Sequence, residues 1–161
     1  MAKVYSGTDS AKPKYRLWYT GYDGTREGIK RLGYATSVDG IAWTRHKDNP
    51  IHDQHWVEDM SIVPHGRVFH MFAEGKDDQA QLLTSRDGVQ WQRAGQLDVR
   101  KANGDPIDPG PYGTPTAWLE DGVWHLFYER SAAGVWLARL RANPAGHRAS
   151  WLATGTRWCA R

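Results

Sequence analysis

The chain has 161 residues, enough for one domain with a real core, and shows no obvious second domain. Its formal net charge of +3 comes from interleaved acidic and basic residues, which argues against a nucleic-acid partner. The longest apolar runs fall well short of the roughly 20 residues of a membrane span, so we expect no membrane partner. Because the start lacks an apolar signal stretch, we expect a cytoplasmic protein, although a chain trimmed after a signal would begin the same way.

Short runs of alternating apolar residues predict β-strands along the whole chain. In chain order the aromatic runs are Tyr15–Thr20, Val68–Glu74 and Val123–Glu129. Each is preceded by a further strand, and these are a short segment at Lys3–Tyr5, then Met60–Val63 and Pro115–Trp118. Turns at His65-Gly66 and at Asp121-Gly122 join the later pairs, as expected of antiparallel hairpins.

An internal repeat is the strongest feature of the sequence. The segments Ala35–Trp43 and Leu83–Trp91 share the pattern Thr-Ser-x-Asp-Gly-x-x-Trp at a separation of 48 residues. A third copy, from Ala138 to Trp151, has lost the hydroxyl pair and the Asp-Gly turn. We expect type I′ turns at the Asp-Gly pairs, a Ser hydroxyl bonded into each turn, and the Trp filling the space between neighbouring units.

The repeat predicts an all-β fold made of β-propeller blades, each of four antiparallel strands. The chain supplies about three blades, with approximate bounds 1–55, 56–103 and 104–161, in one propeller-type domain. The alternative is a β-sandwich with a chance repeat. Three blades leave open sheet faces, so either the chain is a piece of a longer protein or copies associate, most simply as a homodimer.

Several runs resemble the five-bladed propeller glycoside hydrolases of families 32, 43, 62, 68, 117 and 130. They are Tyr15–Gly21, Gly33–Trp43, Asn49–Ile51, Glu58–Val63, Phe69–Gly75, Gly113–Trp118 and Trp124–Arg130. The resemblance implies that a sugar lies over the central axis. It also implies that catalytic carboxylates come from the first residues of the innermost strands, one acting as acid and the other as base or nucleophile.

Asp59 occupies the position of the family's Asp-Pro motif, with Met60 in place of proline, and a turn-capping role is the alternative. Family members usually carry Glu two residues before the proline of the next blade, but here Gly113 stands at that place. Glu74 and Glu129 end the second strands of successive blades. They either face the axis, as acid or sugar-hydroxyl partner, or lie at a blade seam.

Further residues are expected to contact the substrate. The pocket rim would contain His55, Trp56 and Tyr112, and the strand starts would add Glu58 and Thr114. His70 and His125 recur at equivalent positions, where they either pack or line a shared pocket. The seven histidines follow no zinc-ligand spacing, so we expect no metal or other cofactor, and an axial calcium ion is not indicated.

The sequence therefore predicts a glycoside hydrolase-like propeller that acts on or binds carbohydrate, catalytically impaired if the missing general acid is not replaced. One alternative is a non-catalytic carbohydrate-binding or scaffold module. Another is a sialidase-like propeller, because Ser-x-Asp-Gly-x-x-Trp resembles that group's Asp-box. The turn here is one residue shorter, however, and the arginine triad of that group is not evident.

Overall fold

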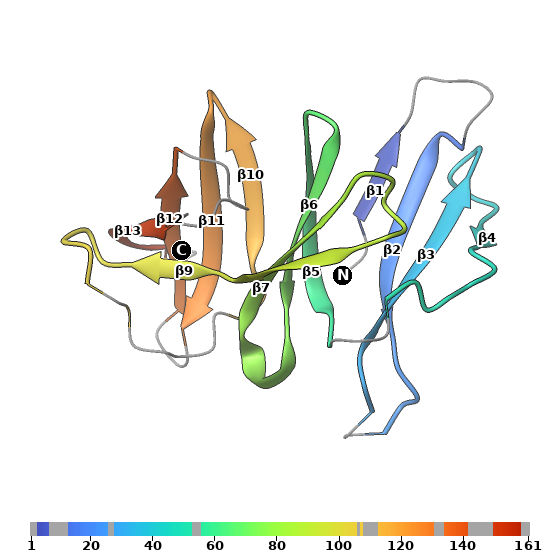
Figure 1. Ribbon diagram of the computed structural model, residues 1–161, viewed down its shortest axis with the longest axis horizontal. Coiled ribbons are helices and arrows are strands. Elements are labelled where there is room, and N and C mark those ends of the chain that lie inside the picture. Colours follow the sequence, from blue (N-terminus) through green and yellow to red (C-terminus); the bar gives the residue numbers. More distant parts are fainter. Residues whose placement is uncertain are drawn as a thin grey trace.

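The structure, a computed structural model, describes residues 3–6, 13–25, 28–52, 56–105, 107, 113–130, 134–141 and 150–158. Its regular structure is almost entirely β-strand, which confirms the predicted fold class. Apart from the short 3-10 turn Lys76–Asp78, the described residues contain no helix, and so none that is long and apolar enough to cross a membrane. The strands form three sheets that follow one another along the chain (Figure 1).

Each sheet is a fan of antiparallel strands. The first contains β1 (Lys3–Ser6), β2 (Tyr15–Gly21), β3 (Arg31–Ser37) and β4 (Thr44–Arg45). The second contains β5 (Glu58–His65), β6 (Val68–Glu74), β7 (Ala80–Ser85) and β8 (Gln92–Gln96). The third contains β10 (Thr116–Glu120), β11 (Val123–Arg130), β12 (Gly134–Leu140) and β13 (Ser150–Trp158). The first strands β1, β5 and β10 contact across the sheets and form the inner edges of three propeller blades.

The third sheet has a fifth strand. β9 (Asp98–Arg100) follows the second blade in sequence, yet it pairs in parallel with the outer strand β13 of the third. The prediction of four strands holds for the first two blades and is incomplete for the third. β9 lies beside the third sheet because Leu97 and Val99 are buried in the core around Trp151.

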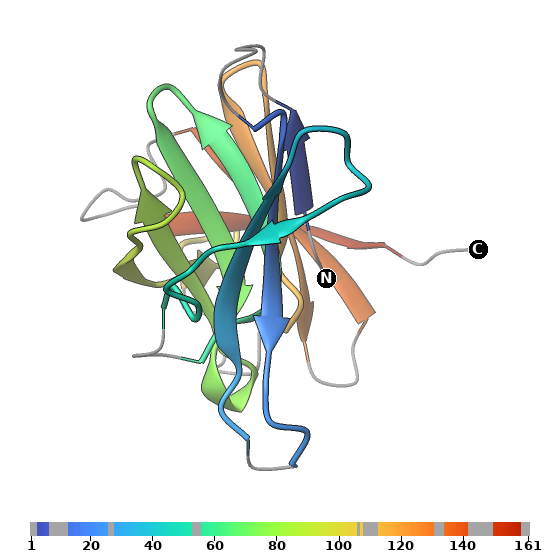
Figure 2. The same ribbon diagram turned by 90° about the vertical axis from the view of Figure 1, so that its right-hand side faces the viewer.

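Apolar side chains fill both seams between the blades. Seen from the side of the first sheet, the other two lie behind it (Figure 2). The seam between the first two blades is centred on Trp18 of β2, which is fully buried and lies edge-on to Trp91, with ring centroids 6.3 Å apart. The Trp18 indole also donates a hydrogen bond to the carbonyl of Gly88 in the neighbouring blade, at 2.7 Å.

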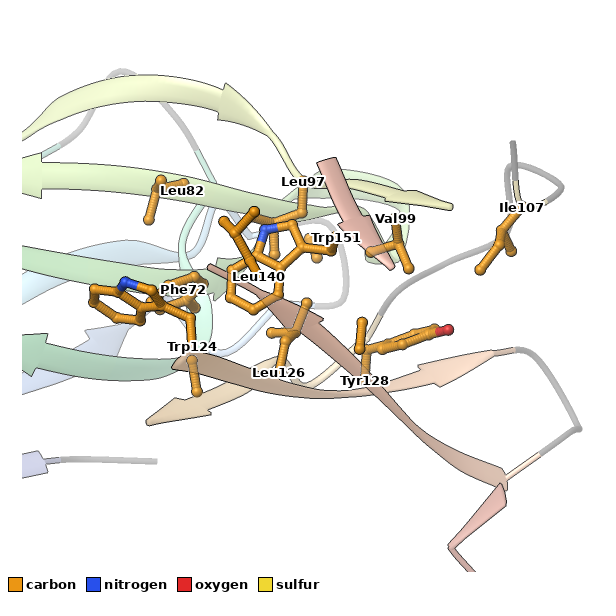
Figure 3. Close-up of a cluster of buried hydrophobic side chains, with 13 residues drawn as sticks. Phe72, Leu82, Leu97, Val99, Ile107, Trp124, Leu126, Tyr128, Leu140 and Trp151 are labelled. Atoms are coloured by element: carbon orange, nitrogen blue, oxygen red, sulfur yellow. The ribbon is translucent and has the colours of Figure 1, made fainter. Parts of the chain in front are cut away.

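The seam between the second and third blades repeats this arrangement. Phe72 of β6 is fully buried and lies edge-on to Trp151, with centroids 5.8 Å apart. Figure 3 shows Phe72 and Trp124 on one side of Trp151 and Val99 on the other. Trp18 and Phe72 thus occupy equivalent positions and fill the seam to the next blade, because alternate residues of a second strand face that blade.

The Asp-Gly turns differ from the prediction. Type I′ geometry requires positive φ at both central residues, but only Gly40 (φ 81°) and Gly88 (φ 82°) have it, so the predicted turn type is wrong. The aspartates instead organise longer turns. Asp39 accepts hydrogen bonds from the backbone N–H groups of the two residues after Gly40, and Asp87 does the same after Gly88. These bonds lower the pKa of Asp39, and they outweigh partial burial to lower that of Asp87.

Of the two other predictions about these turns, that of a bonded serine hydroxyl is confirmed at both turns and that of a seam-filling tryptophan is confirmed at the second. The Ser37 and Ser85 hydroxyls each accept the N–H of the turn glycine at 2.8 Å. The tryptophan after the second turn, Trp91, fills the seam beside Trp18. A two-residue turn with positive φ at both residues does occur, at Asp121-Gly122 between β10 and β11 (φ 49° and 73°).

Candidate functional site

The inner strands of the second and third blades begin with the same backbone distortion. Asp59, the second residue of β5, has φ 45°, and Thr114, two residues before β10, has φ 50°. A positive φ is uncommon outside glycine and is an outlier for the β-branched Thr. Such conformations persist only where the surroundings hold them, and they cluster at functional sites. The two strand starts that the sequence selected are therefore equivalent in backbone as well as in position.

Glu74 brings a carboxyl group to the start of the third blade. It ends β6, is 8% exposed, and its Oε2 accepts the backbone N–H of Thr114 at 3.0 Å. Its Oε2 also lies 3.1 Å from the place where a Cβ on Gly113 would stand. The glycine leaves room for this carboxyl, because any side chain at position 113 would press against it.

The same surroundings change the acidity of Glu74. Burial raises its pKa to about 7, and three further effects act in the same direction: a hydrogen bond that the protonated carboxyl donates to Asp78 and the charges of Asp78 and Glu58. The N–H of Thr114 acts in the opposite direction and is outweighed. A carboxyl with a pKa near 7 is partly protonated at neutral pH and can both give and accept a proton there.

Glu58 lies directly across the strand pair from Glu74, since the two are register partners of β5 and β6. Its carboxylate accepts the indole N–H of Trp56 at 2.5 Å, and the ammonium of Lys30 lies 3.6 Å away. Lys30 also sits over the ring of Tyr22, 3.8 Å from its centroid. Next to the buried carboxyl there is thus a half-buried carboxylate framed by two aromatic rings and a cation.

Trp56 connects this carboxylate to a small pocket of about 250 Å³. The pocket is lined by Trp56, Gly75, Lys76, Gln79, Gln81, Arg93 and Gln96. Gln81 donates to the carbonyl of Trp56 at 2.6 Å and accepts from Arg93, which fixes the wall nearest to the indole. An aromatic face surrounded by amide and cationic groups can contact a sugar ring and its hydroxyls.

Other residues selected from the sequence lie elsewhere. His70 is near the start of β6, four residues from Glu74 and therefore about 13 Å away along the strand. His125 and Glu129 of β11 lie on the side of the third blade that faces away from the second, where Glu129 is exposed and His125 stacks on Trp118. His55 and Tyr112 lie outside the described residues.

The sequence selected Trp56, Glu58, Asp59, Glu74 and Thr114, and the structure gathers these at the inner ends of the second and third blades. It did not select Gly113, Lys30, Tyr22 or Asp78 as parts of the site. The sequence feature that pointed to position 113 was that glycine stands there in place of the glutamate usual in the family. Lys30 and Tyr22 come from the first blade, so only blade packing could place them here. Among the described residues, no three histidine, cysteine or acidic side chains are grouped as metal ligands.

Several solved glycoside hydrolases have the same architecture as this chain, whereas no sequence-family profile matches it. RS223 β-xylosidase superposes with a TM-score of 0.70 at 14% identity, over 96% of this chain and 55% of its own. CoXyl43, a family 43 β-xylosidase/α-arabinofuranosidase from a compost metagenome solved with xylotriose, gives 0.67 at 14% identity, over 94% and 55%. The family 32 β-fructofuranosidase of Bombyx mori, solved as a mutant with sucrose, gives 0.59 at 15% identity, over 88% and 34%.

The chain spans about half the length, or less, of the solved chains that it matches. The shared part is the arrangement of blades described above, which agrees with the resemblance found in the sequence motifs. Over the part of their length that it spans, the protein has the β-propeller fold of these glycoside hydrolases.

Proposed function

We propose that this protein is a carbohydrate-active propeller of glycoside hydrolase type, with its site at the inner ends of the second and third blades. The observation that carries the proposal is the buried Glu74 carboxyl, whose pKa is raised to about 7 and which is held at the start of the third blade's inner strand. Fold likeness alone would not support an activity, because one fold serves many functions.

Glu74 replaces the carboxyl that the resemblance leads one to expect at position 113. A side chain there would begin 3.1 Å from Glu74 Oε2, so the carboxyl from the second blade occupies the space next to that backbone. The chain lacks the usual glutamate in sequence but supplies a carboxyl close to the same point in space. Its raised pKa suits the proton donor that glycoside hydrolysis requires.

The remaining roles follow from the neighbours of Glu74. Asp59, at the distorted start of β5, is the base or nucleophile, as the sequence resemblance implies. Glu58 binds sugar hydroxyls, together with Trp56 and the amide side chains of the adjoining pocket. Solved propellers of similar fold hold xylotriose and sucrose, so pentose- and fructose-containing saccharides are the substrates to test first.

The test is hydrolysis of aryl β-xylosides, aryl α-arabinofuranosides and sucrose by the wild type and by Glu74→Gln. The matched control is Glu129→Gln, which alters the equivalent strand position on the exposed side of the third blade. We expect turnover in the wild type and the control, and at least a 100-fold loss in Glu74→Gln. Equal turnover by all three would show that Glu74 is not the proton donor.

A double variant tests the spatial replacement directly. Glu74→Ala removes the carboxyl and opens the space beside Gly113, and Gly113→Glu then places a carboxyl at the family's usual position. We expect the double variant to recover part of the turnover that Glu74→Ala loses. A double variant that folds but shows no turnover would contradict the proposal that Glu74 replaces the carboxyl expected at position 113.

A binding module without catalysis is the second candidate, favoured by the low exposure of Glu74, at 8%. In that case no glycoside is turned over, while xylotriose still binds to the wild type and to Glu74→Gln. Trp56→Ala would then abolish binding, since Trp56 lines the pocket together with the amide side chains. If no tested saccharide were either hydrolysed or bound, both candidates would be contradicted.

We also propose that the outer face of the third blade self-associates, most simply in a two-fold dimer. Trp118, His125 and Phe127 on this face are half-buried, whereas His70 and Phe72 at equivalent positions of the second blade are 3% and 0% exposed. A second copy would cover the face as the third blade covers the second. Sedimentation velocity at micromolar concentration should show a dimer that Trp118→Asp weakens, and a clean wild-type monomer would contradict this.

A further inference from the structure

A second hollow lies at the opposite end of the seam from the carboxylates. It has a volume of about 660 Å³ and is bounded by residues at the distal ends of the second and third blades. His65 ends β5, His70 is near the start of β6, and Trp124 is near the start of β11. The proposed glycosidase site uses none of these groups. Because His70 is about 13 Å along the strand from Glu74, the two sites are separate.

The floor of this hollow is made of rings. His70 and Trp124 are each 3% exposed, with centroids 5.1 Å apart, and the exposed His65 lies edge-on to Trp124 at 5.7 Å. The rim is polar, since Thr84, Gln90 and Gln92 contribute a hydroxyl and two amides. The hollow falls within the range of roughly 300–1,000 Å³ that is typical of sites for organic ligands, and it is larger than one inorganic anion needs.

Two guanidinium groups give the hollow its charge. Arg86, in the turn after β7, and Arg141, after β12, both line it and are exposed, and neither forms an ion pair with the described residues. The opposing charge is the carboxylate of Asp87, which is already bound by the N–H groups of Val89 and Gln90. The hollow is therefore lined by two cationic side chains and one carboxylate, and that carboxylate is already hydrogen-bonded within its own turn.

We propose that this hollow binds a carboxylate-bearing saccharide, such as a uronic acid. The carboxylate would be held between Arg86 and Arg141, since guanidinium groups pair with carboxylates through two parallel hydrogen bonds. The hydroxyls of the ring would bond to Thr84, Gln90 and Gln92, and the imidazole of His65 would cover one face of the sugar. The inference is independent of the glycosidase activity, because no residue belongs to both sites.

The test is calorimetric or NMR titration with D-galacturonate and D-glucuronate, against D-galactose and D-glucose, at low ionic strength. We expect at least one uronate to bind at least tenfold more tightly than its neutral counterpart. Arg86→Gln and Arg141→Gln should each weaken that binding at least tenfold. Arg45→Gln serves as the matched control, since Arg45 is also exposed but lies in β4 of the first blade.

Four results would overturn the inference. Uronates and neutral sugars binding equally would remove the role of the two guanidiniums, as would unchanged uronate affinity in both arginine variants. Inorganic phosphate binding as tightly as the uronates would show a general anion site without saccharide recognition. Loss of uronate binding in Glu74→Gln, with Arg86→Gln unaffected, would place the ligand at the carboxylate site instead.

Discussion

The second strands of the middle and last blades share three of six residues, and they have very different surroundings. β6 reads Phe-His-Met-Phe-Ala-Glu from Phe69, and β11 reads Trp-His-Leu-Phe-Tyr-Glu from Trp124. In β6, the last Phe and the Glu are buried against the third blade. Their counterparts in β11 lie on a face that no further blade of the described chain covers. The shared pattern gives equivalent strands, but the chemistry of the side chains depends on what packs against each strand.

The largest expected difference between the two strands is in how much their phenylalanines stabilise the fold. Phe72→Ala should lower the free energy of unfolding by about 3–5 kcal/mol, because it opens a cavity beside Trp151 and Trp124. Phe127→Ala should cost clearly less, about 1–2 kcal/mol, since Phe127 is only half-buried. Urea denaturation at low protein concentration measures both. Equal losses would mean that the outer face of the third blade is as tightly packed as the seam.

A smaller effect is expected from pH. The folded-state pKa of Glu74 is raised from 4.5 to about 7, so the folded protein holds a proton that the unfolded chain has released. Stability should therefore fall as pH rises from 4.5 to about 7, and Glu74→Gln should remove this part of the dependence. Glu129→Gln, at the equivalent exposed position, should leave it unchanged. Denaturation midpoints at pH 5 and pH 8 measure the slope, and identical slopes in all three proteins would contradict the burial of a protonated Glu74.

The smallest effect concerns the hydrogen bonds inside the two Asp-Gly turns. Ser37→Ala and Ser85→Ala each remove a hydroxyl that accepts the glycine N–H of its Asp-Gly turn and donates to the aspartate. Each substitution should lower the free energy of unfolding by about 1 kcal/mol, and the two decreases should agree within about 0.5 kcal/mol. Thermal or urea unfolding measures both losses. A much larger loss in one variant would show that the hydrogen bonds from Arg16 and Trp18 of the first blade to the second turn change what its serine contributes.

Strand positions, the blade repeat and the hydroxyl-aspartate turns could all be predicted from the sequence, because they depend on local alternation and on residues two to four positions apart. The turn type was wrong because Asp39 and Asp87 use their carboxylates to cap a longer turn rather than adopting positive φ. The fifth strand of the third sheet was missed, because β9 pairs with β13, about 50 residues later in the chain.

The sequence by itself determined the unit of construction, a four-stranded antiparallel blade, and it offered Glu58, Asp59, Glu74 and Glu129 as candidate carboxylates. Tertiary structure decided which carboxyl is buried, that Gly113 makes room for it, and that Lys30 from another blade lies beside Glu58. The physical reason is that alternation sets the face on which a side chain lies. Desolvation and charge pairing, which set its acidity, depend on groups that meet only when the blades pack together.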